Sequence, residues 1–407
     1  MKSVKKNLLL IALLFIFQSN KTLWCQAQIT DNEELITYWN QQRKGTNHFN
    51  NIPSKEWFNA ANQANIKFVR LVYEKWAGEN KYFLMGNADN YQGIVEKDFQ
   101  KLKYFLDYAN TLNIKVVITP ISIPGEKWTQ SNNNKKDGRL WMEKKYLKQA
   151  TKYWKDLAFR LKGHPAIVGY NLVNEPHPEI YYKKYDFWKR DLDDWYETVK
   201  GSPADLNLFN KKLVEAIRSV DKATPIIIES GLYSTPWAFD YLYPIEDDKI
   251  IYSFHMYQPY DFINKKINKG RYSYPGKMTI KETGKTFELN KESLSNFLKP
   301  VKEWAQKNNI PSNRIWVSEF GCDRRIKGVD IYLSDLITIF NENNWHWSFY
   351  TYREDDGWDA MDYELGKKEV HFTYWEYQEE KTMHLNYSTI YNRVTDSFWD
   401  IFQKEFK

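Results

Sequence analysis

Short apolar runs alternate with longer segments of helical periodicity from residue 44 to the end of the chain. The short runs have the length and apolar character of buried strands. Strands joined by helices run parallel, because a helical crossover returns the chain to the end of the sheet at which the previous strand began. The predicted strands span residues 44–50, 66–72, 114–119, 166–174, 225–229, 250–255, 315–319 and 345–352.

The segments between these runs carry apolar residues three and four positions apart, which is the spacing of an amphipathic helix. The clearest case spans residues 96–113, where Phe99, Leu102, Phe105, Leu106, Ala109 and Leu112 fall on one face. The same spacing predicts helices over residues 54–65, 140–161, 206–220, 294–305, 333–340 and, at the end of the chain, within 386–406. Residues 122–138 and 258–290 are predicted to be loops.

Eight strands alternating with helices predict an α/β fold, a closed (β/α)8 TIM barrel. The alternative is an open, doubly wound sheet, which favours a glycine-rich phosphate turn after an early strand, and the sequence has none. Repeats of fixed period, linkers and low-complexity tracts are also missing from the sequence. We therefore predict a single domain over residues 28–407.

The start of the chain has the pattern of a secretory signal peptide, predicted over residues 1–27. Lysines precede an apolar run at 8–17, and Cys25-Gln26-Ala27 offers a cleavage site. The run is too short to span a membrane. A lipid anchor at Cys25 is the alternative, although Trp24 stands where such a site prefers a small residue. The mature chain is predicted to be secreted or periplasmic, without a membrane span.

Removal of this leader changes the electrostatic picture. It takes away four lysines and no acid, so the formal net charge falls from +6 to +2, and the sequence gives no argument for nucleic acid as a partner. Only Cys322 remains of the two cysteines, which excludes an intramolecular disulfide. We expect a monomer.

Aromatic residues make up 17% of the chain, and these rings either line a cleft or fill the core.

Polar residues stand at the ends of the predicted strands, where a barrel of this class places its active site. They are Arg70, Asn174 with Glu175, Glu229, His255 with Tyr257, Glu319, and the aromatic cluster around Trp347. Each one alone has a structural interpretation, such as an ion pair or a turn. A carboxylate at the mouth of a buried strand is costly, however, and several polar groups on one rim together predict a site.

Two carboxylates facing one substrate can hydrolyse a glycosidic bond. One is protonated and donates to the leaving oxygen, while the other is ionised and attacks the anomeric carbon. The strands that end in Glu175 and Glu319 lie across the barrel from each other, so their side chains can converge. A separation of about 5–5.5 Å predicts retention of configuration, and about 6.5–9.5 Å predicts inversion.

The set Arg70, Asn174-Glu175-Pro176, His255-Met256-Tyr257 and Glu319-Phe320-Gly321 resembles glycoside hydrolase family 5, the cellulase family of retaining (β/α)8 glycosidases. The resemblance implies that Glu175 is the acid/base and Glu319 the nucleophile.

The same resemblance implies roles for four neighbours. Asn174 would hold the sugar 2-hydroxyl group, and Arg70 would hydrogen-bond Glu319 and keep it ionised. Tyr257 would orient the same nucleophile, and His255 would line the site near the acid/base.

The sequence departs from the family pattern in two places. The family often has a histidine after the third strand, where this chain reads Thr119-Pro120-Ile121-Ser122. It also places a stacking tryptophan at the end of the eighth strand. Here Trp347, Tyr350 or Trp358 could take that role, and Trp347 or Trp358 is favoured.

Other candidates are weaker. Trp76, Trp128 and Trp237 each follow a strand and could form sugar subsites or pack under loops. Glu229 is interpreted as a rim or structural carboxylate. No metal or cofactor is predicted, because the acidic run 354–359 lacks the spacing of a calcium loop and His48 has no second histidine beside it.

The sequence thus predicts a secreted, retaining endo-β-glycosidase that acts on a β-linked glycan. An endo-β-1,4-glucanase is favoured, with an endo-β-mannanase or a glycoconjugate-directed β-glycosidase as alternatives. A carbohydrate-binding barrel without catalysis is the alternative from another class, and the intact glutamate pair with its Arg70 and Tyr257 argues against it.

Overall fold

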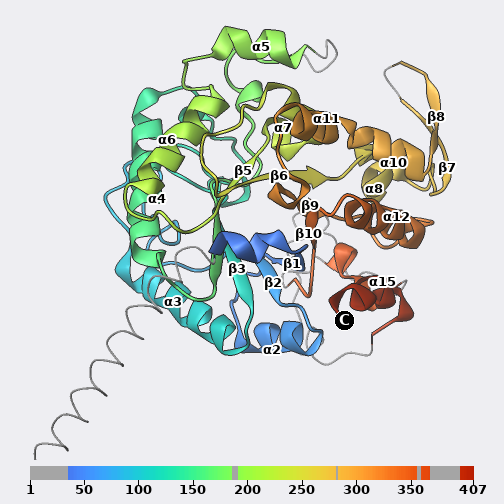
Figure 1. Ribbon diagram of the computed structural model, residues 1–407, viewed down its shortest axis with the longest axis horizontal. Coiled ribbons are helices and arrows are strands. Elements are labelled where there is room, and N and C mark those ends of the chain that lie inside the picture. Colours follow the sequence, from blue (N-terminus) through green and yellow to red (C-terminus); the bar gives the residue numbers. More distant parts are fainter. Residues whose placement is uncertain (1–34, 186–190, 281–282, 355–358, 367–394) are drawn as a thin grey trace, which may run out of the picture.

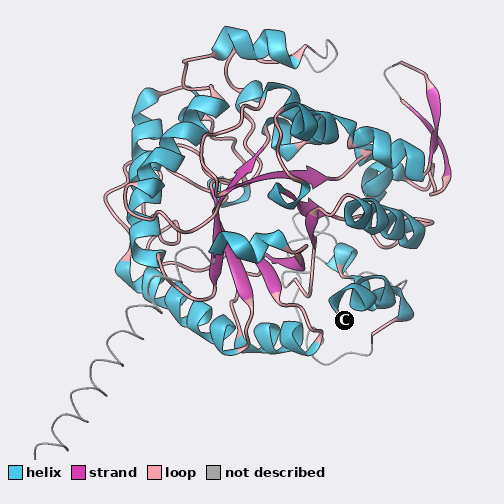
Figure 2. Cartoon of the chain, in the orientation of Figure 1, coloured by secondary structure: helices cyan, strands magenta, loops and turns pink. Residues whose placement is uncertain are grey.

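The computed structural model describes residues 35–185, 191–280, 283–354, 359–366 and 395–407, and within these ranges eight parallel strands form a closed barrel. Figures 1 and 2 show the strands at the centre of a ring of helices. The predicted (β/α)8 TIM barrel is confirmed. Around the barrel, the strands follow the order β1 (Lys44–His48), β10 (His346–Phe349), β9 (Ile315–Phe320), β6 (Ile250–Met256), β5 (Ile226–Glu229), β4 (Ile167–Asn171), β3 (Lys115–Thr119) and β2 (Phe68–Val72).

The helices bury their apolar faces against the outside of the barrel, as their periodicity predicts. They are α2 (Lys55–Gln63), α3 (Glu96–Thr111), α4 (Lys144–Leu161), α6 (Leu206–Arg218), α10 (Lys291–Phe297), α11 (Lys299–Lys307) and α12 (Val329–Glu342). The predicted helix 294–305 is in fact two helices, α10 and α11, which meet at Leu298. The last predicted helix is much shorter in the described residues, where α15 spans Asp400–Gln403.

Several elements have no counterpart in the prediction. The predicted loop 258–290 contains α8 (Tyr260–Ile263), α9 (Lys265–Asn268) and an antiparallel hairpin, β7 (Gly276–Thr279) with β8 (Thr286–Leu289). The hairpin projects from the barrel at the right of Figure 1 and is largely solvent-accessible, which explains why it has no apolar run. Helix α5 (Leu192–Val199) and the short turn α7 (Gly231–Ser234) are also additional.

Short 3-10 turns complete the described structure. They span Tyr38–Asn40, Gln130–Asn132, Arg139–Trp141, Pro178–Ile180, Pro236–Tyr241, Ser312–Arg314, Asp359–Met361, Tyr363–Leu365, Ser397–Trp399 and Lys404–Phe406. Among the described residues, no helix combines the length and apolarity needed to cross a membrane. The predicted signal peptide lies outside the described residues, and the domain boundaries remain predictions.

The barrel interior is filled at the end opposite the predicted site. Trp39 lies just before β1, is fully buried, and donates from its indole Nε1 to the carbonyl oxygen of Val168 at 2.9 Å. Around it packs one apolar cluster contributed by different strands, formed by Phe68, Val117, Val168, Ile227, Ile251 and Trp316. This plug leaves the carboxyl ends of the strands as the open end of the barrel.

His346 joins the first and last strands of the barrel. Its fully buried imidazole accepts a hydrogen bond at Nδ1 from the backbone N–H of Arg43 at 2.9 Å, and its Nε2 lies 3.1 Å from the carbonyl oxygen of Asn313. A neutral imidazole supplies the acceptor and the donor that these two contacts need. Burial lowers the pKa of His346 to about 3, so the ring is neutral in the folded protein.

The pKa of His346 predicts a loss of stability in acid. Below its ordinary pKa of 6.5 the unfolded chain binds a proton that the folded ring does not take up until about pH 3. Its contribution to the free energy of unfolding is therefore complete above pH 6.5 and decreases as the pH falls, by roughly 2 kcal/mol at pH 5. His346→Gln removes this titration, so urea unfolding should show a smaller cost of the substitution at pH 5 than at pH 7.5. An equal cost at both pH values would contradict the assignment.

Candidate active site

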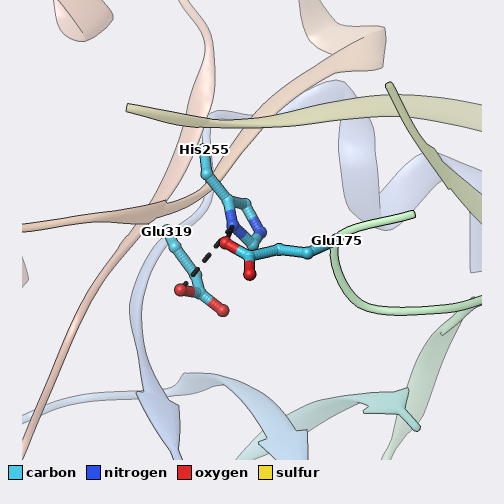
Figure 3. Close-up of side chains that lie close together, drawn as sticks. All are labelled: Glu175, His255 and Glu319. Atoms are coloured by element: carbon cyan, nitrogen blue, oxygen red, sulfur yellow. Dashed lines mark hydrogen bonds and ion pairs between the residues drawn. The ribbon is translucent and has the colours of Figure 1, made fainter. Parts of the chain in front are cut away.

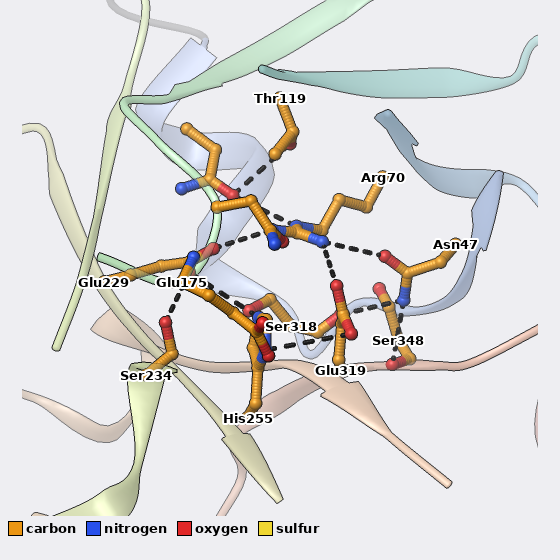
Figure 4. A network of polar contacts seen from close by, with 12 residues as sticks. Asn47, Arg70, Thr119, Glu175, Glu229, Ser234, His255, Ser318, Glu319 and Ser348 are labelled. Carbon is orange, nitrogen blue, oxygen red and sulfur yellow. Dashed lines mark hydrogen bonds and ion pairs between the residues drawn. The ribbon is translucent and has the colours of Figure 1, made fainter. Parts of the chain in front are cut away.

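Arg70 is the centre of the polar residues at the open end of the barrel. Its side chain is fully buried in β2, and its guanidinium nitrogens donate to oxygens from four other strand ends (Figure 4). The acceptors are the Oδ1 atoms of Asn171 at 3.0 Å, Asn47 at 3.1 Å and Asn174 at 2.7 Å, and the Oε1 atoms of Glu319 at 2.5 Å and Glu229 at 2.7 Å. All five N–H donors of the guanidinium can be satisfied in this arrangement.

Glu319 stands near the end of β9, and each of its carboxylate oxygens has a donor. Oε1 accepts from Arg70, and Oε2 accepts from the Tyr257 hydroxyl at 2.9 Å, so both predicted contacts are present. Burial raises the pKa of Glu319, while the positive charges of His255 and Arg70 act against that rise. The effect expected of Arg70 therefore exists, but it does not determine the pKa by itself because burial outweighs it.

Glu175 follows β4 and faces Glu319 across the site (Figure 3). Its backbone has a positive φ of 51°, and its side chain is 33% exposed. One carboxylate oxygen lies 2.9 Å from Nδ1 of His255. Oxygens of Glu175 and Glu319 and a nitrogen of His255 lie within 4.8 Å of one another. The two predicted carboxylates thus converge as expected.

His255 is buried between three carboxylates. A register shift in the pairing of β6 with β9 places it directly opposite Glu319. Its Nδ1 lies 3.7 Å from Glu319 Oε2, and its Nε2 lies 3.6 Å from Glu229 Oε2. Burial alone would lower the pKa of His255, but the charges of Glu319 and Glu229 raise it to about 10. The imidazole is therefore a second cation beside Arg70.

The sequence left two interpretations of Glu229, a carboxylate on the rim or a structural one. The structure agrees with the second. Glu229 is 2% exposed and lies beneath the site, bonded to Arg70 and to the backbone N–H of Glu175 at 2.7 Å. Burial opposes its charge, yet His255 and Arg70 hold the pKa of Glu229 at about 2. No signal in the sequence distinguishes this deep position from the rim, because Glu229 is the last residue of its strand in either case.

The residues surround a cleft of about 970 Å³. Asn174, Glu175, His255, Tyr257 and Glu319 line it, as predicted. Aromatic rings from several loops also line it, namely Phe49, Trp128, Tyr233, Trp237, Tyr260 and Tyr350. Trp128 and Trp237 are therefore cleft residues.

Two of the other sequence candidates are core residues. Trp76 is 2% exposed and packs edge-on against Phe83 and Phe105. Trp347 is fully buried, packs against Phe320 and Phe406, and donates from Nε1 to Asn341 Oδ1 at 3.2 Å.

The prediction that Trp347 stacks on the sugar is therefore wrong. Side chains alternate between the two faces of a strand, and Trp347 is on the face of β10 that meets the helices. Trp358 lies outside the described residues. Tyr350, the residue after β10, is the ring from this strand end that lines the cleft, and Ile121 lines it where the family often has a histidine.

The trio Glu175, His255 and Glu319 also has the proximity that a metal site needs. A hydrogen bond and an ion pair already join these residues to one another, however. Both ring nitrogens of His255 face carboxylate oxygens, Nδ1 that of Glu175 and Nε2 that of Glu229, as N–H donors do. This donor set is suited to holding and transferring a proton.

The comparisons with known proteins agree with this architecture. The sequence model of the cellulase family, glycosyl hydrolase family 5, matches residues 30–356. Endoglucanase C of Acetivibrio thermocellus is 22% identical over 316 residues, which cover 71% of this chain and 82% of that protein.

Two solved structures have a similar fold. Endoglucanase Cel5A of Thermotoga maritima superposes with a TM-score of 0.57 at 17% identity, over 79% of this chain and 91% of that one. Endoglucanase Cel5A of Pseudomonas stutzeri gives 0.55 at 19% identity, over 79% and 88%.

Because Trp347 lies in the core and Tyr350 in the cleft, substitution of the first should affect stability and substitution of the second should affect substrate binding. Trp347→Ala should lower the free energy of unfolding by about 3–5 kcal/mol, because it removes a fully buried indole. Trp347→Phe should stay folded with an unchanged KM for soluble β-glucan, the substrate favoured by the sequence. Tyr350→Ala should raise that KM on the order of tenfold, because it removes a ring from the cleft. Urea unfolding and steady-state kinetics measure both effects. A raised KM in Trp347→Phe at unchanged stability would restore Trp347 as a stacking residue.

Proposed function

The chain belongs to the cellulase family, glycosyl hydrolase family 5, and is a glycoside hydrolase; from this membership we propose that it is a secreted, retaining endo-β-glycosidase. Glu175 is the acid/base and Glu319 the nucleophile in this proposal. Secretion, or export to the periplasm, rests on the predicted signal peptide at residues 1–27 and a catalytic domain that begins at residue 28.

The separation of the two glutamates carries the proposal. Their carboxylates approach to within 4.8 Å, together with His255. This distance supports retention, because inverting enzymes keep about 6.5–9.5 Å between the carboxyl groups to admit a water molecule.

The reaction proceeds in two displacements. In the first, Glu319 attacks the anomeric carbon while Glu175 donates its proton to the leaving oxygen, which breaks the glycosidic bond and forms a glycosyl ester. In the second, Glu175 takes a proton from water, the water oxygen attacks the same carbon, and Glu319 is released. Asn174, whose Oδ1 is fixed by Arg70, is placed to bind the sugar 2-hydroxyl group.

The charges at the site are balanced when the reacting pair holds one proton. Arg70 and His255 are two buried cations, and Glu175, Glu229 and Glu319 are three carboxyl groups in contact with them. The group is electrically neutral when one carboxyl group holds a proton. Glu229 has a pKa of about 2 and stays ionised, so in the neutral group the proton is on Glu175 or Glu319. Double displacement needs one protonated and one ionised member of this pair.

An aromatic cleft supports action within a glycan chain. Rings on several loops around the glutamates can stack on successive sugar units. The relatives named endoglucanases make an endo-β-1,4-glucanase the first candidate. An endo-β-mannanase is the second, because Thermotoga maritima Cel5A, which shares this fold, has been solved with mannotriose as well as with cellobiose. Comparing kcat/KM on β-1,4-glucan and on β-mannan separates the two.

Replacement of the proposed acid tests its role through the leaving group. Glu175→Gln should lower kcat/KM on β-1,4-glucan by about 10²- to 10⁴-fold, because the alkoxide leaving group needs a proton. The loss on 2,4-dinitrophenyl β-cellobioside should be far smaller, because dinitrophenolate leaves without one. Steady-state kinetics on both substrates give the two ratios. Equal losses on the two substrates would remove Glu175 from the acid role.

A further inference from the structure

We propose that Glu229 is a positioning residue whose carboxylate fixes the backbone of the acid/base Glu175 and connects it to the nucleophile Glu319. This inference rests on the proposed function of Glu175 and Glu319 and adds a third carboxylate to their site. Glu229 is fully enclosed by the residues around it, so it acts through Glu175 rather than on the substrate.

The first observation is the backbone conformation of Glu175. Its φ of 51° is in the left-handed region, which residues with a side chain seldom adopt. Such a conformation persists when surrounding contacts hold it. The backbone N–H of Glu175 donates to Glu229 Oε2 at 2.7 Å, so the contact that holds this residue is a hydrogen bond to an ionised carboxylate.

The same oxygen also holds the neighbouring loop. Leu232, Tyr233 and Ser234 in α7 all have positive φ. Ser234 Oγ donates to Glu229 Oε2 at 2.5 Å, and the N–H of Tyr233 donates to the carbonyl oxygen of Pro176 at 3.2 Å. One carboxylate oxygen therefore fastens two strained segments, the loop after β4 and the loop after β5, to each other.

The other oxygen reaches the nucleophile through Arg70. Glu229 Oε1 accepts from Arg70 Nη2 at 2.7 Å, and Nη1 of the same guanidinium donates to Glu319 at 2.5 Å. Figure 4 shows Glu229 at the left of this network, beside Glu175, with Arg70 and Glu319 to its right. The carboxylate thus sets where the acid/base lies relative to the nucleophile.

This role needs a carboxylate rather than a side chain of similar shape. Both oxygens of Glu229 face donors, the guanidinium on one side and the N–H of Glu175 on the other. A glutamine would place its amide N–H₂ group against one of these donors. Glu229→Gln should therefore disturb the position of Glu175 although it is nearly isosteric.

The test compares Glu229→Gln with wild type on β-1,4-glucan and on 2,4-dinitrophenyl β-cellobioside. We expect kcat/KM on glucan to fall on the order of 10- to 100-fold, as for the loss of a hydrogen bond to a charged group. The loss on the aryl glycoside should be several-fold smaller, because its leaving group does not need the acid. A residue that only stabilised the fold would lower both values by the same factor.

A matched control is Glu179→Gln. Glu179 is a buried carboxyl group on the adjacent loop and binds the N–H of Leu232 at 3.0 Å and the Tyr241 hydroxyl, without a contact to Glu175. Its substitution should leave the ratio of the two kcat/KM values unchanged. Ser234→Ala is the second variant, and should lower the glucan value selectively by several-fold because it removes one of the two hydrogen bonds that hold Glu229 Oε2.

Glu175→Gln, measured in parallel, separates the inference from its premise. If Glu175→Gln shows the selective loss on glucan and Glu229→Gln lowers both substrates equally, the positioning role is overturned while the acid/base assignment stands. If Glu175→Gln shows no selective loss, the proposed function fails and the role of Glu229 fails with it. Should Glu229→Gln not fold, an unchanged ratio in Ser234→Ala overturns the inference and a selective loss supports it.

Discussion

The buried guanidinium of Arg70 is the interaction on which the site depends. Removing a cation from water costs several kcal/mol, and only well-placed acceptors repay that cost. The acceptors here come from β1, β5 and β9 and from both the end of β4 and the loop after it. A change in the register of any of these strands would leave a donor of Arg70 unpaired. The fold and the positions of Glu229, Asn174 and Glu319 are therefore fixed by one set of hydrogen bonds.

The burial of Arg70 also affects the charges of the residues around it. His255, beside Arg70, is charged because carboxylates surround it, and Glu229 is ionised because both cations contact it. These charges determine each other, so none of the three residues can be understood alone. The five groups are electrically neutral when Glu175 and Glu319 together hold one proton. Because Arg70, Glu229, His255 and Glu319 are buried, such a balance is far less costly than a net charge.

The sequence predicted what depends on local pattern. The apolar runs gave all eight strands, and Glu175 and Glu319 were found because each ends a buried run. The sequence did not predict what depends on tertiary packing. Trp347 was assigned to the cleft because the face of a four-residue strand cannot be read without its neighbours. The hairpin β7–β8 was missed because it buries little apolar surface, and the depth of Glu229 because a strand end looks the same beneath a site as on its rim.

We propose that Glu175 and Glu319 act as an acid/base and a nucleophile in two successive displacements. Proton NMR of cello-oligosaccharide hydrolysis, recorded before mutarotation, measures the configuration of the first product formed. Two inversions at the anomeric carbon restore the β configuration, so the β-anomer should appear first and the α-anomer should increase later. An α-anomer as the initial product would show a single inversion and would contradict the role of Glu319 as nucleophile.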